Sequence, residues 1–286
     1  MTIKRIAIAG LGLIGGSIAL ALRNAGFAGE IVGCDRAEVI ERAVERGVIN
    51  RGNADPIATA HGCEVVVLAT PVGAIIDLIE RLGPVIPAST LLTDVGSTKR
   101  EISDRAQQVF GSAAATRFLP SHPMAGAEHA GLDHARAELF RGAPWVFTAI
   151  DGPPERGSTA AEWISCVETL GATPVFLDAA RHDRLLAWAS HLPQMISTAL
   201  ASALDAEFGD DPAIREISGR GLRDMTRLAA SSYGMWRDIV ATNNKNLSDA
   251  LLKYEQQLSH LRDHLRGPAL REEFDAANRF RKNLKS

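Results

Sequence analysis

The segment Ile6-Ala7-Ile8-Ala9-Gly10-Leu11-Gly12-Leu13-Ile14-Gly15 indicates the architecture of the N-terminal half of this chain. An apolar run rich in β-branched residues stops at glycines, and an amphipathic helical pattern follows. The spacing is G-x-G-x-x-G. Gly10 makes the turn, Gly12 lets the backbone approach a pyrophosphate, and Gly15 lets the helix pack closely on the strand. Because the helix begins there, its free N–H groups and positive dipole end face the phosphates. The whole stretch is therefore predicted to bind a dinucleotide.

A carboxylate follows the second predicted strand. The strand runs from Glu30 to Cys34, and Asp35 comes near the spacing expected for a residue that binds the adenine ribose hydroxyls. Such a carboxylate repels the extra phosphate of NADP, which favours NAD. Arg36 comes next and leaves partial accommodation of that phosphate open, and Asp35 as a plain turn residue is the simpler alternative.

Composition is that of an ordinary globular protein long enough for two domains. The 286 residues are 46% hydrophobic and 23% charged, with a net charge of −3. The slight acidity argues against nucleic acid as a partner. Cys34, Cys63 and Cys166 are scattered without a C-x-x-C motif, which predicts reduced thiols in a cytoplasmic protein and no metal site.

The uncharged stretch 6–22 follows Lys4 and Arg5 and so resembles a signal peptide or a short membrane span. It contains four glycines and continues into an amphipathic pattern, so the nucleotide-binding turn explains it better. No other stretch approaches the length of a membrane span, and we expect no membrane partner.

Strand and helix patterns alternate through residues 1–177. Beyond the first two strands, the expected strands are 64–70, 90–94, 145–150 and 173–177, and the expected helices are 37–46, 72–82 and 99–110. Thr70 and Pro71, at the end of the third strand, are placed with the cofactor-binding residues. This alternation predicts an α/β fold with a Rossmann-type, doubly wound parallel sheet.

Residues 178–286 show only helical patterns, so we predict an all-helical C-terminal domain. Pro193 is expected to interrupt its helix. Apolar stripes on these helices first indicate an ordinary core. Their second interpretation is a subunit interface, which predicts a homodimer formed through the helical domain.

Polar clusters follow the predicted strands where ligands bind in open α/β sheets. His122, between Ser121 and Pro123, falls where a nicotinamide would lie, and its ordinary pKa of about 6.5 suits proton transfer. A histidine that merely ties down a loop is the alternative. The strand-end position and the neighbouring cluster at Ser97 favour a catalytic role.

These clusters and four later motifs resemble the prephenate/arogenate (cyclohexadienyl) dehydrogenases. The resemblance covers Lys4 to about Asn246 and is carried by Asp94-Val95-Gly96-Ser97-Thr98-Lys99, Ser121-His122-Pro123-Met124-Ala125-Gly126-Ala127-Glu128, His182-Asp183, Ser190-His191-Leu192-Pro193, Arg223-Asp224-Met225-Thr226-Arg227 and Met235-Trp236-Arg237-Asp238-Ile239. It implies NAD-dependent oxidative decarboxylation of prephenate, arogenate or both, in tyrosine biosynthesis.

The resemblance also implies residue roles. His122 takes the proton of the substrate ring hydroxyl as hydride leaves the same carbon, and Ser97 orients His122 and touches that hydroxyl. The remaining members of the site contact or gate the substrate: Arg227 at a carboxylate, His191, Asp224 and Glu128. Without the resemblance, Asp224 and Arg227 are a surface ion pair sharing a helix face, and His191 is a core histidine before a proline.

Two other classes stay open from the sequence. A β-hydroxyacid or imino-acid oxidoreductase also joins a Rossmann domain to a helical one, and the hydroxyacid enzymes use a lysine for which Lys245 is the candidate. A non-enzymatic regulator that senses NAD would bind the cofactor without turnover.

Overall fold

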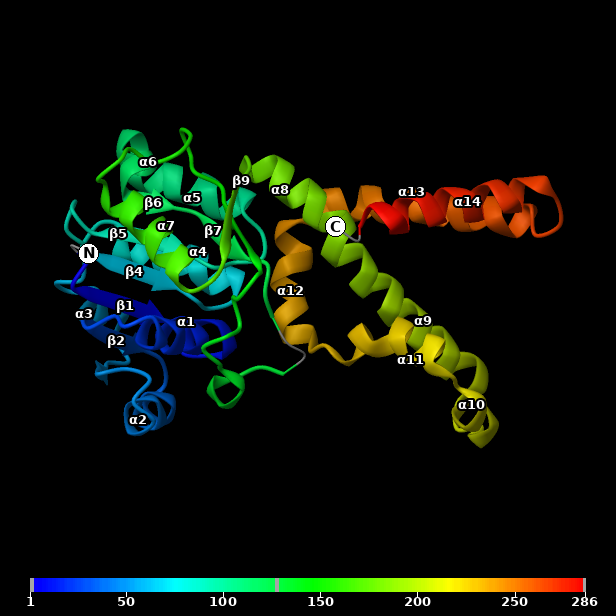
Figure 1. Cartoon of the computed structure of the whole chain (residues 1–286), viewed down its shortest axis with the longest axis horizontal. Coiled ribbons are helices and arrows are strands. Elements are labelled where there is room, and N and C mark those ends of the chain that lie inside the picture. Colours follow the sequence, from blue (N-terminus) through cyan, green and yellow to red (C-terminus); the bar gives the residue numbers. More distant parts are fainter. Residues whose placement is uncertain (1–2, 127–128, 285–286) are drawn as a thin grey trace.

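A six-stranded parallel sheet forms the centre of the N-terminal half (Figure 1). The computed structural model describes residues 3–126 and 129–284. The spatial order is β3-β2-β1-β4-β5-β6, with the strands β3 Arg51–Gly52, β2 Glu30–Cys34, β1 Arg5–Ala9, β4 Val65–Leu68, β5 Leu91–Asp94 and β6 Phe118–Leu119. This is the strand order of a Rossmann fold, so the predicted fold class is confirmed for this half.

Alternate residues of the central strand β1 enter two different cores. Ile6 and Ile8 pack with the helices on one face, whereas Ala7 and Ala9 pack with those on the other. The first face carries α1 Leu13–Asn24, α2 Ala37–Glu45 and α7 Thr159–Thr169. The second carries α3 Pro56–Ala60, α4 Val72–Leu82, α5 Arg100–Phe110 and α6 Ala114–Arg117. Burial on both faces explains why these strands are continuous apolar runs.

Two predicted strands were assigned to the wrong sheet. The runs at 145–150 and 173–177 form β8 Pro144–Phe147 and β9 Thr173–Phe176, which pair with β7 Ser121–Pro123 in a separate three-stranded sheet. β7 is antiparallel to β8. Pro120 lies between β6 and β7 and has no N–H with which to continue the first ladder, so the chain changes sheets there.

From residue 178 onward the described chain contains helices and turns only. They are α8 Ala179–Leu186, a π-helical turn Ala187–His191, α9 Leu192–Phe208, α10 Pro212–Ile217, α11 Arg220–Thr226, a 3₁₀ turn Arg227–Ala230, α12 Tyr233–Thr242, α13 Asn244–Asp263 and α14 Pro268–Asn283. Pro193 stands in the first turn of α9, directly after the π-helical turn, as expected for an interrupted helix. No helix among the described residues combines the length and apolarity needed to cross a bilayer.

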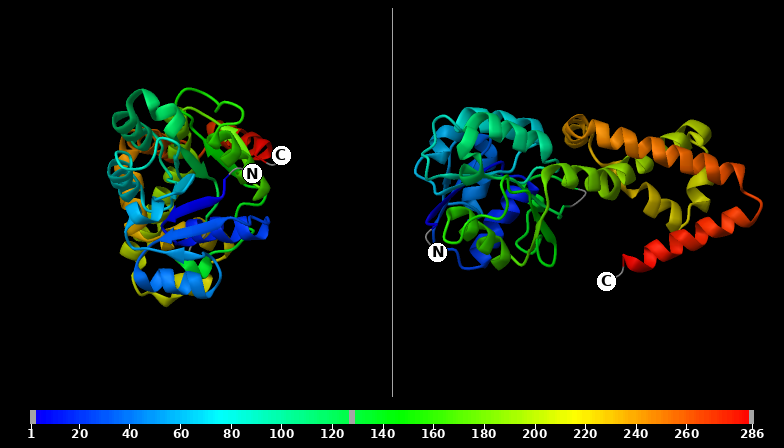
Figure 2. Two further views of the ribbon diagram at one scale, coloured as in Figure 1. Left: turned by 90° about the vertical axis from the view of Figure 1, so that its left-hand side faces the viewer. Right: turned by 90° about the horizontal axis from the view of Figure 1, so that it is seen from above.

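The helical half buries little of its own apolar surface. Its buried core cluster contains only Leu192, Leu247 and Ala250, and α14 buries no residue. The first half of α13 packs on α8 and α9, where Leu247 and Ala250 are buried, whereas its second half and α14 extend outwards and diverge from the turn that joins them (Figures 1 and 2). Large apolar side chains on this hairpin are exposed, including Phe274 at 64% and Phe280 at 67%. This surface needs a cover that the single chain does not supply.

Candidate active site

The glycine turn has the tight geometry that the motif predicts. Gly10 has φ +96°, and a Cβ there would lie 2.4 Å from the carbonyl oxygen of Ala69. A Cβ on Gly15 would lie 1.9 Å from the carbonyl oxygen of Gly10, so only glycine lets α1 pack this closely. At Gly12 an added Cβ would meet no atom within 4 Å. Gly12 therefore faces open space, as a residue beside a bound pyrophosphate must.

A cleft of about 340 Å³ opens beside this turn. Gly10, Asp35, Arg36 and Thr70 contribute to its wall. The Asp35 carboxylate accepts the N–H of Leu11 at 2.7 Å and that of Arg36 at 2.8 Å, which fixes it at the mouth of the turn. The hydroxyl of Thr70 is buried without a hydrogen-bond partner among the described residues. These features fit the adenosine half of a dinucleotide.

The other predicted cofactor residues surround the cleft without lining it. Leu11 to Gly15 form the turn and the start of α1, and Pro71 is the exposed N-cap of α4. Sequence reasoning missed Asp77 and Arg81, which line the cleft from α4. They lie four positions apart, on one helix face, and this spacing was the available signal.

A buried ion pair joins the end of β5 to β7. Lys99 and Asp94 contact each other, and both side chains are fully buried. Asp94 accepts the backbone N–H of Ser121 at 3.1 Å, and Lys99 donates to the carbonyl of Ser121 at 2.7 Å. Burial raises the pKa of Asp94 and lowers that of Lys99, because each charge has lost its water. The pair fixes the strand that carries His122.

The sheet register places this pair on the same edge as the glycine turn. Ala9, Leu68 and Asp94 are aligned on three adjacent strands. Two strand spacings therefore separate the end of β1 from the end of β5, roughly 10 Å. The C-terminal ends of β1 and β5 thus lie at the same edge of the sheet. This edge, with β7 beside it, faces the helical half.

His122 is held by a second histidine, from the helical half. Its Nδ1 lies 3.0 Å from Nε2 of His182, and Nδ1 of His182 lies 2.8 Å from Oδ1 of Asp183. His122 is 9% exposed, and burial, together with the neighbouring His182, Lys99 and His191, holds its pKa well below the ordinary 6.5. The ring is therefore uncharged at neutral pH, as a base must be.

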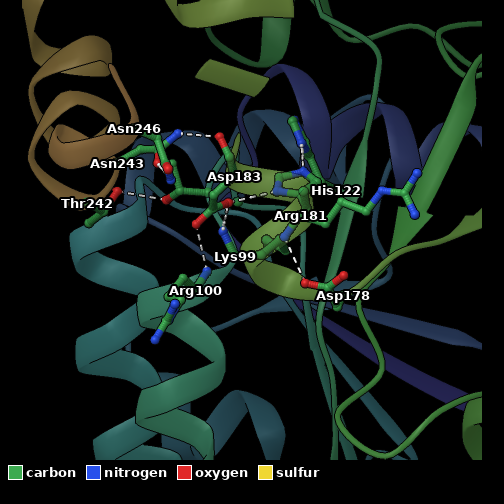
Figure 3. Close-up of polar contacts among 12 residues, drawn as sticks. Lys99, Arg100, His122, Asp178, Arg181, Asp183, Thr242, Asn243 and Asn246 are labelled. Atoms are coloured by element: carbon green, nitrogen blue, oxygen red, sulfur yellow. Dashed lines mark hydrogen bonds and ion pairs between the residues drawn. The ribbon is translucent and has the colours of Figure 1, made fainter. Parts of the chain in front are cut away.

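Asp183 joins the two halves of the protein (Figure 3). Its Oδ1 accepts the N–H of Lys99 at 2.7 Å and its Oδ2 accepts the N–H of Arg100 at 2.9 Å. A second tie is the 2.7 Å hydrogen bond between the hydroxyls of Thr98 and Thr242. The site therefore lies at the boundary of the two halves and is built by both.

His191 presents a buried, unpaired donor at the same boundary. The amide nitrogen of Asn243 donates to the carbonyl oxygen of Asp183 at 2.8 Å, and the same nitrogen lies 3.1 Å from Nδ1 of His191. Because Nδ1 then accepts, the proton of a neutral His191 is on Nε2, which is buried without a partner among the described residues. Nε1 of Trp236 is likewise buried and unpaired, and its ring meets His191 edge-on at 5.8 Å. The boundary of the two halves thus holds two buried donors that the described residues leave unpaired.

The remaining predicted residues are less closely integrated. Ser97 is half-buried after β5, and its hydroxyl makes no hydrogen bond to His122 or to other described residues. Arg227 is exposed at the start of the 3₁₀ turn. This turn is tied to α9, because the side-chain amide of Gln194 donates to the carbonyl oxygen of Leu228. Gln194 follows His191 by three residues.

Asp224 is exposed and pairs with Arg220 at 3.6 Å. Glu128 lies outside the described residues. Lys245, the lysine needed by the hydroxyacid alternative, is exposed near the start of α13. The described residues contain no group of three or more potential metal ligands.

Sequence and structure comparisons find the same family for both halves. Residues 18–173 match the family model described as prephenate dehydrogenase, nucleotide-binding domain, and residues 178–285 match prephenate dehydrogenase, dimerization domain. The two matches together include nearly all of the chain.

Individual relatives agree with these matches. A prephenate dehydrogenase of Lactococcus lactis is 31% identical over 90% of this chain and 70% of its own length. A cyclohexadienyl dehydrogenase of Zymomonas mobilis is 30% identical over 99% of this chain and 97% of its own. Among solved structures, the Aquifex aeolicus prephenate dehydrogenase in complex with hydroxyphenyl propionate and NAD⁺ has a TM-score of 0.84 and 28% identity, covering 100% of this chain and 97% of that one.

Proposed function

The chain belongs to the prephenate dehydrogenase family, and from this membership we propose that it catalyses the NAD-dependent oxidative decarboxylation of prephenate, arogenate or both. The step serves tyrosine biosynthesis. The observation that supports it most is the uncharged, hydrogen-bonded His122 at the strand edge shared with the glycine turn. The exposed position of Lys245 argues against the hydroxyacid alternative.

NAD, when bound along the turn and the Asp35 cleft, supplies the acceptor for the hydride of the substrate. The protein's own task at the reacting carbon is to manage one proton. As the carbon is oxidised, Nε2 of His122 takes the proton of its hydroxyl. Loss of carbon dioxide then returns an electron pair to the ring oxygen, which recovers the proton from His122. The protons balance, and the ring becomes aromatic, which makes the step effectively irreversible.

The substrate's two carboxylates require donors outside the reacting centre. We assign Arg227 to one carboxylate, because a guanidinium can bind it with two parallel hydrogen bonds. The unpaired Nε2–H of His191 is a second donor. Ser97 is assigned to the ring hydroxyl, and Asp224 and Glu128 to the rim of the site. The two substrates differ in one group of the side chain, which is a ketone in prephenate and an ammonium in arogenate. An acidic residue near this group favours arogenate. Asp224 is therefore the proposed determinant of substrate preference.

We further propose that the protein acts as a homodimer in the cytoplasm. The exposed apolar side chains of α13 and α14 support an interface in the helical half, and the family model that matches this half is a dimerization domain. Its three free cysteines suit a reducing compartment. We place the boundary between the domains at residues 177 and 178, within the connection from β9 to α8.

The test follows reduced nicotinamide by absorbance with NAD or NADP against prephenate and arogenate. We expect reduction of NAD with at least one substrate and one carbon dioxide released per NADH. His122→Asn should lower kcat by roughly 10²- to 10⁴-fold while NAD still binds. The matched control His61→Asn changes an exposed histidine outside the site and should act like wild type. If neither cofactor is reduced with either substrate, the proposal is wrong.

A further inference from the structure

His182 and Asp183 are buried at the site, yet the proposed reaction gives them no role. We propose that they are positioning residues, which keep the lone pair of His122 on Nε2 and share the positive charge that His122 acquires. This inference rests on the proposed function. The two residues come from α8 of the helical half, whereas His122 lies on β7 of the N-terminal half. The base would therefore be competent only when the halves are joined.

The chain of hydrogen bonds begins at a fixed acceptor. Asp183 accepts the backbone N–H groups of Lys99 and Arg100, at the N-terminus of α5 (Figure 3). The positive end of that helix dipole favours a negative carboxylate at this place. Because the carboxylate can only accept, the 2.8 Å contact requires Nδ1 of His182 to donate.

The tautomer of His122 follows from this anchor. A neutral His182 that donates from Nδ1 has a lone pair on Nε2. Nδ1 of His122, 3.0 Å away, must then carry the hydrogen and donate it. The lone pair of neutral His122 is left on Nε2, the nitrogen assigned to the substrate hydroxyl. Without Asp183, His182 can adopt the other tautomer, and His122 then loses its basic Nε2.

The same series of hydrogen bonds also accommodates the positive charge that His122 acquires. Burial and the neighbours His182, Lys99 and His191 all disfavour a positive charge on His122, and Asp94 faces Lys99 instead. Among the described residues, the only carboxylate connected to His122 through side-chain hydrogen bonds is that of Asp183, which is reached through His182. When Nε2 of His122 takes the substrate proton, Nδ1 can pass its own proton to Nε2 of His182. The charge then rests beside Asp183, and the transfer reverses when the ring oxygen recovers its proton.

The first experiment compares substitutions by their kinetics over a range of pH. Asp183→Asn should lower kcat by about 100-fold or more, with KM values changed less than about threefold. The acid limb of its kcat/KM profile should move to lower pH, because the pair His122 and His182 is harder to protonate without the carboxylate of Asp183. Asp238→Asn is the matched control. Asp238 also reaches from the helical half to a backbone N–H, that of Gly73 at 3.1 Å, but contacts no histidine. Its acid limb should stay in place.

Two substitutions of His182 separate positioning from charge sharing. The amide oxygen of His182→Gln can still accept from Nδ1 of His122, whereas His182→Leu cannot. We expect the glutamine variant to retain at least about ten times the kcat of the leucine variant and to remain below wild type. Equal activity of the two variants, or an Asp183→Asn variant with an unmoved acid limb, would overturn the proposal.

A spectroscopic measurement needs neither turnover nor a folded variant. In wild-type protein labelled with ¹⁵N-histidine, long-range proton–nitrogen correlation should show an unprotonated Nε2 and a protonated Nδ1 for His122. The opposite tautomer refutes the inference even if the enzyme is active. Conversely, an inactive wild-type protein with the expected tautomer would refute the proposed function and leave the positioning chain intact.

Discussion

Substitution by alanine is expected to have opposite effects on stability and on NAD binding at two glycines of the nucleotide turn. Gly15→Ala places a Cβ 1.9 Å from the carbonyl oxygen of Gly10, so the backbone must move by about 1.5 Å to reach the 3.4 Å at which ordinary van der Waals contact begins. Such overpacking costs about 1–3 kcal/mol, offset by the roughly 0.5–1 kcal/mol that alanine gains over glycine inside a helix. Because the clash is with a backbone atom, which cannot move aside as a flexible side chain can, the upper end of that cost applies, and we expect a net loss of about 2 kcal/mol in the free energy of unfolding.

Gly12→Ala should leave stability nearly unchanged and impair cofactor binding. Gly12 has φ −76° and ψ −156°, a conformation open to alanine, and its new Cβ meets no protein atom within 4 Å. We expect a stability change below about 1 kcal/mol, since glycine is only moderately better than alanine at an N-cap. The methyl group would occupy space needed by the pyrophosphate, so the Kd for NAD should rise at least about tenfold.

Urea unfolding with and without NAD distinguishes the two substitutions. In wild type, NAD at 100 times its Kd should add about 2.7 kcal/mol to the free energy of unfolding. Gly12→Ala should unfold like wild type without NAD and lose about half of that gain or more at the same NAD concentration. If Gly12→Ala is destabilised as much as Gly15→Ala, or binds NAD like wild type, the reasoning about this turn is wrong.

Three further predictions concern the cofactor, pH and assembly. Asp35→Ser should raise the kcat/KM for NADP relative to NAD at least about tenfold, because Arg36 and Arg81 line the same cleft; an unchanged ratio would remove Asp35 as the determinant. Burial lowers the pKa of His191 to about 4, so the folded state binds fewer protons than the unfolded state between pH 4 and 6.5. The contribution of His191 to stability should therefore rise by about 3 kcal/mol across this range and level off above it, at 1.36 kcal/mol per pH unit, and urea unfolding of His191→Gln should show a shallower rise. Phe280→Glu on α14, where the side chain is 67% exposed, should yield a folded monomer by light scattering; a persistent dimer would place the interface elsewhere.

Local physical rules explain why the first half could be predicted. The glycine turn, the carboxylate at Asp35 and the buried parallel strands all follow from residues that are neighbours in sequence. Pro71 before α4 and Pro193 before α9 act on their own turns, so their effects were also predictable. The two strands at 144–147 and 173–176 were recognised, but their sheet was not, because an apolar strand pattern does not specify its partner.

The nucleotide turn, the α/β pattern and the strand end that carries His122 could all be derived from the amino-acid sequence, since each depends on backbone conformation over a few residues. The contacts of His122, in contrast, depend on how the two halves pack against each other. His182 lies 60 positions away and on the other half of the protein, and its contact exists because Asp183 docks on the N-terminus of α5. A hydrogen bond between distant residues depends on the packing of whole elements, and no pattern of neighbouring side chains encodes that packing.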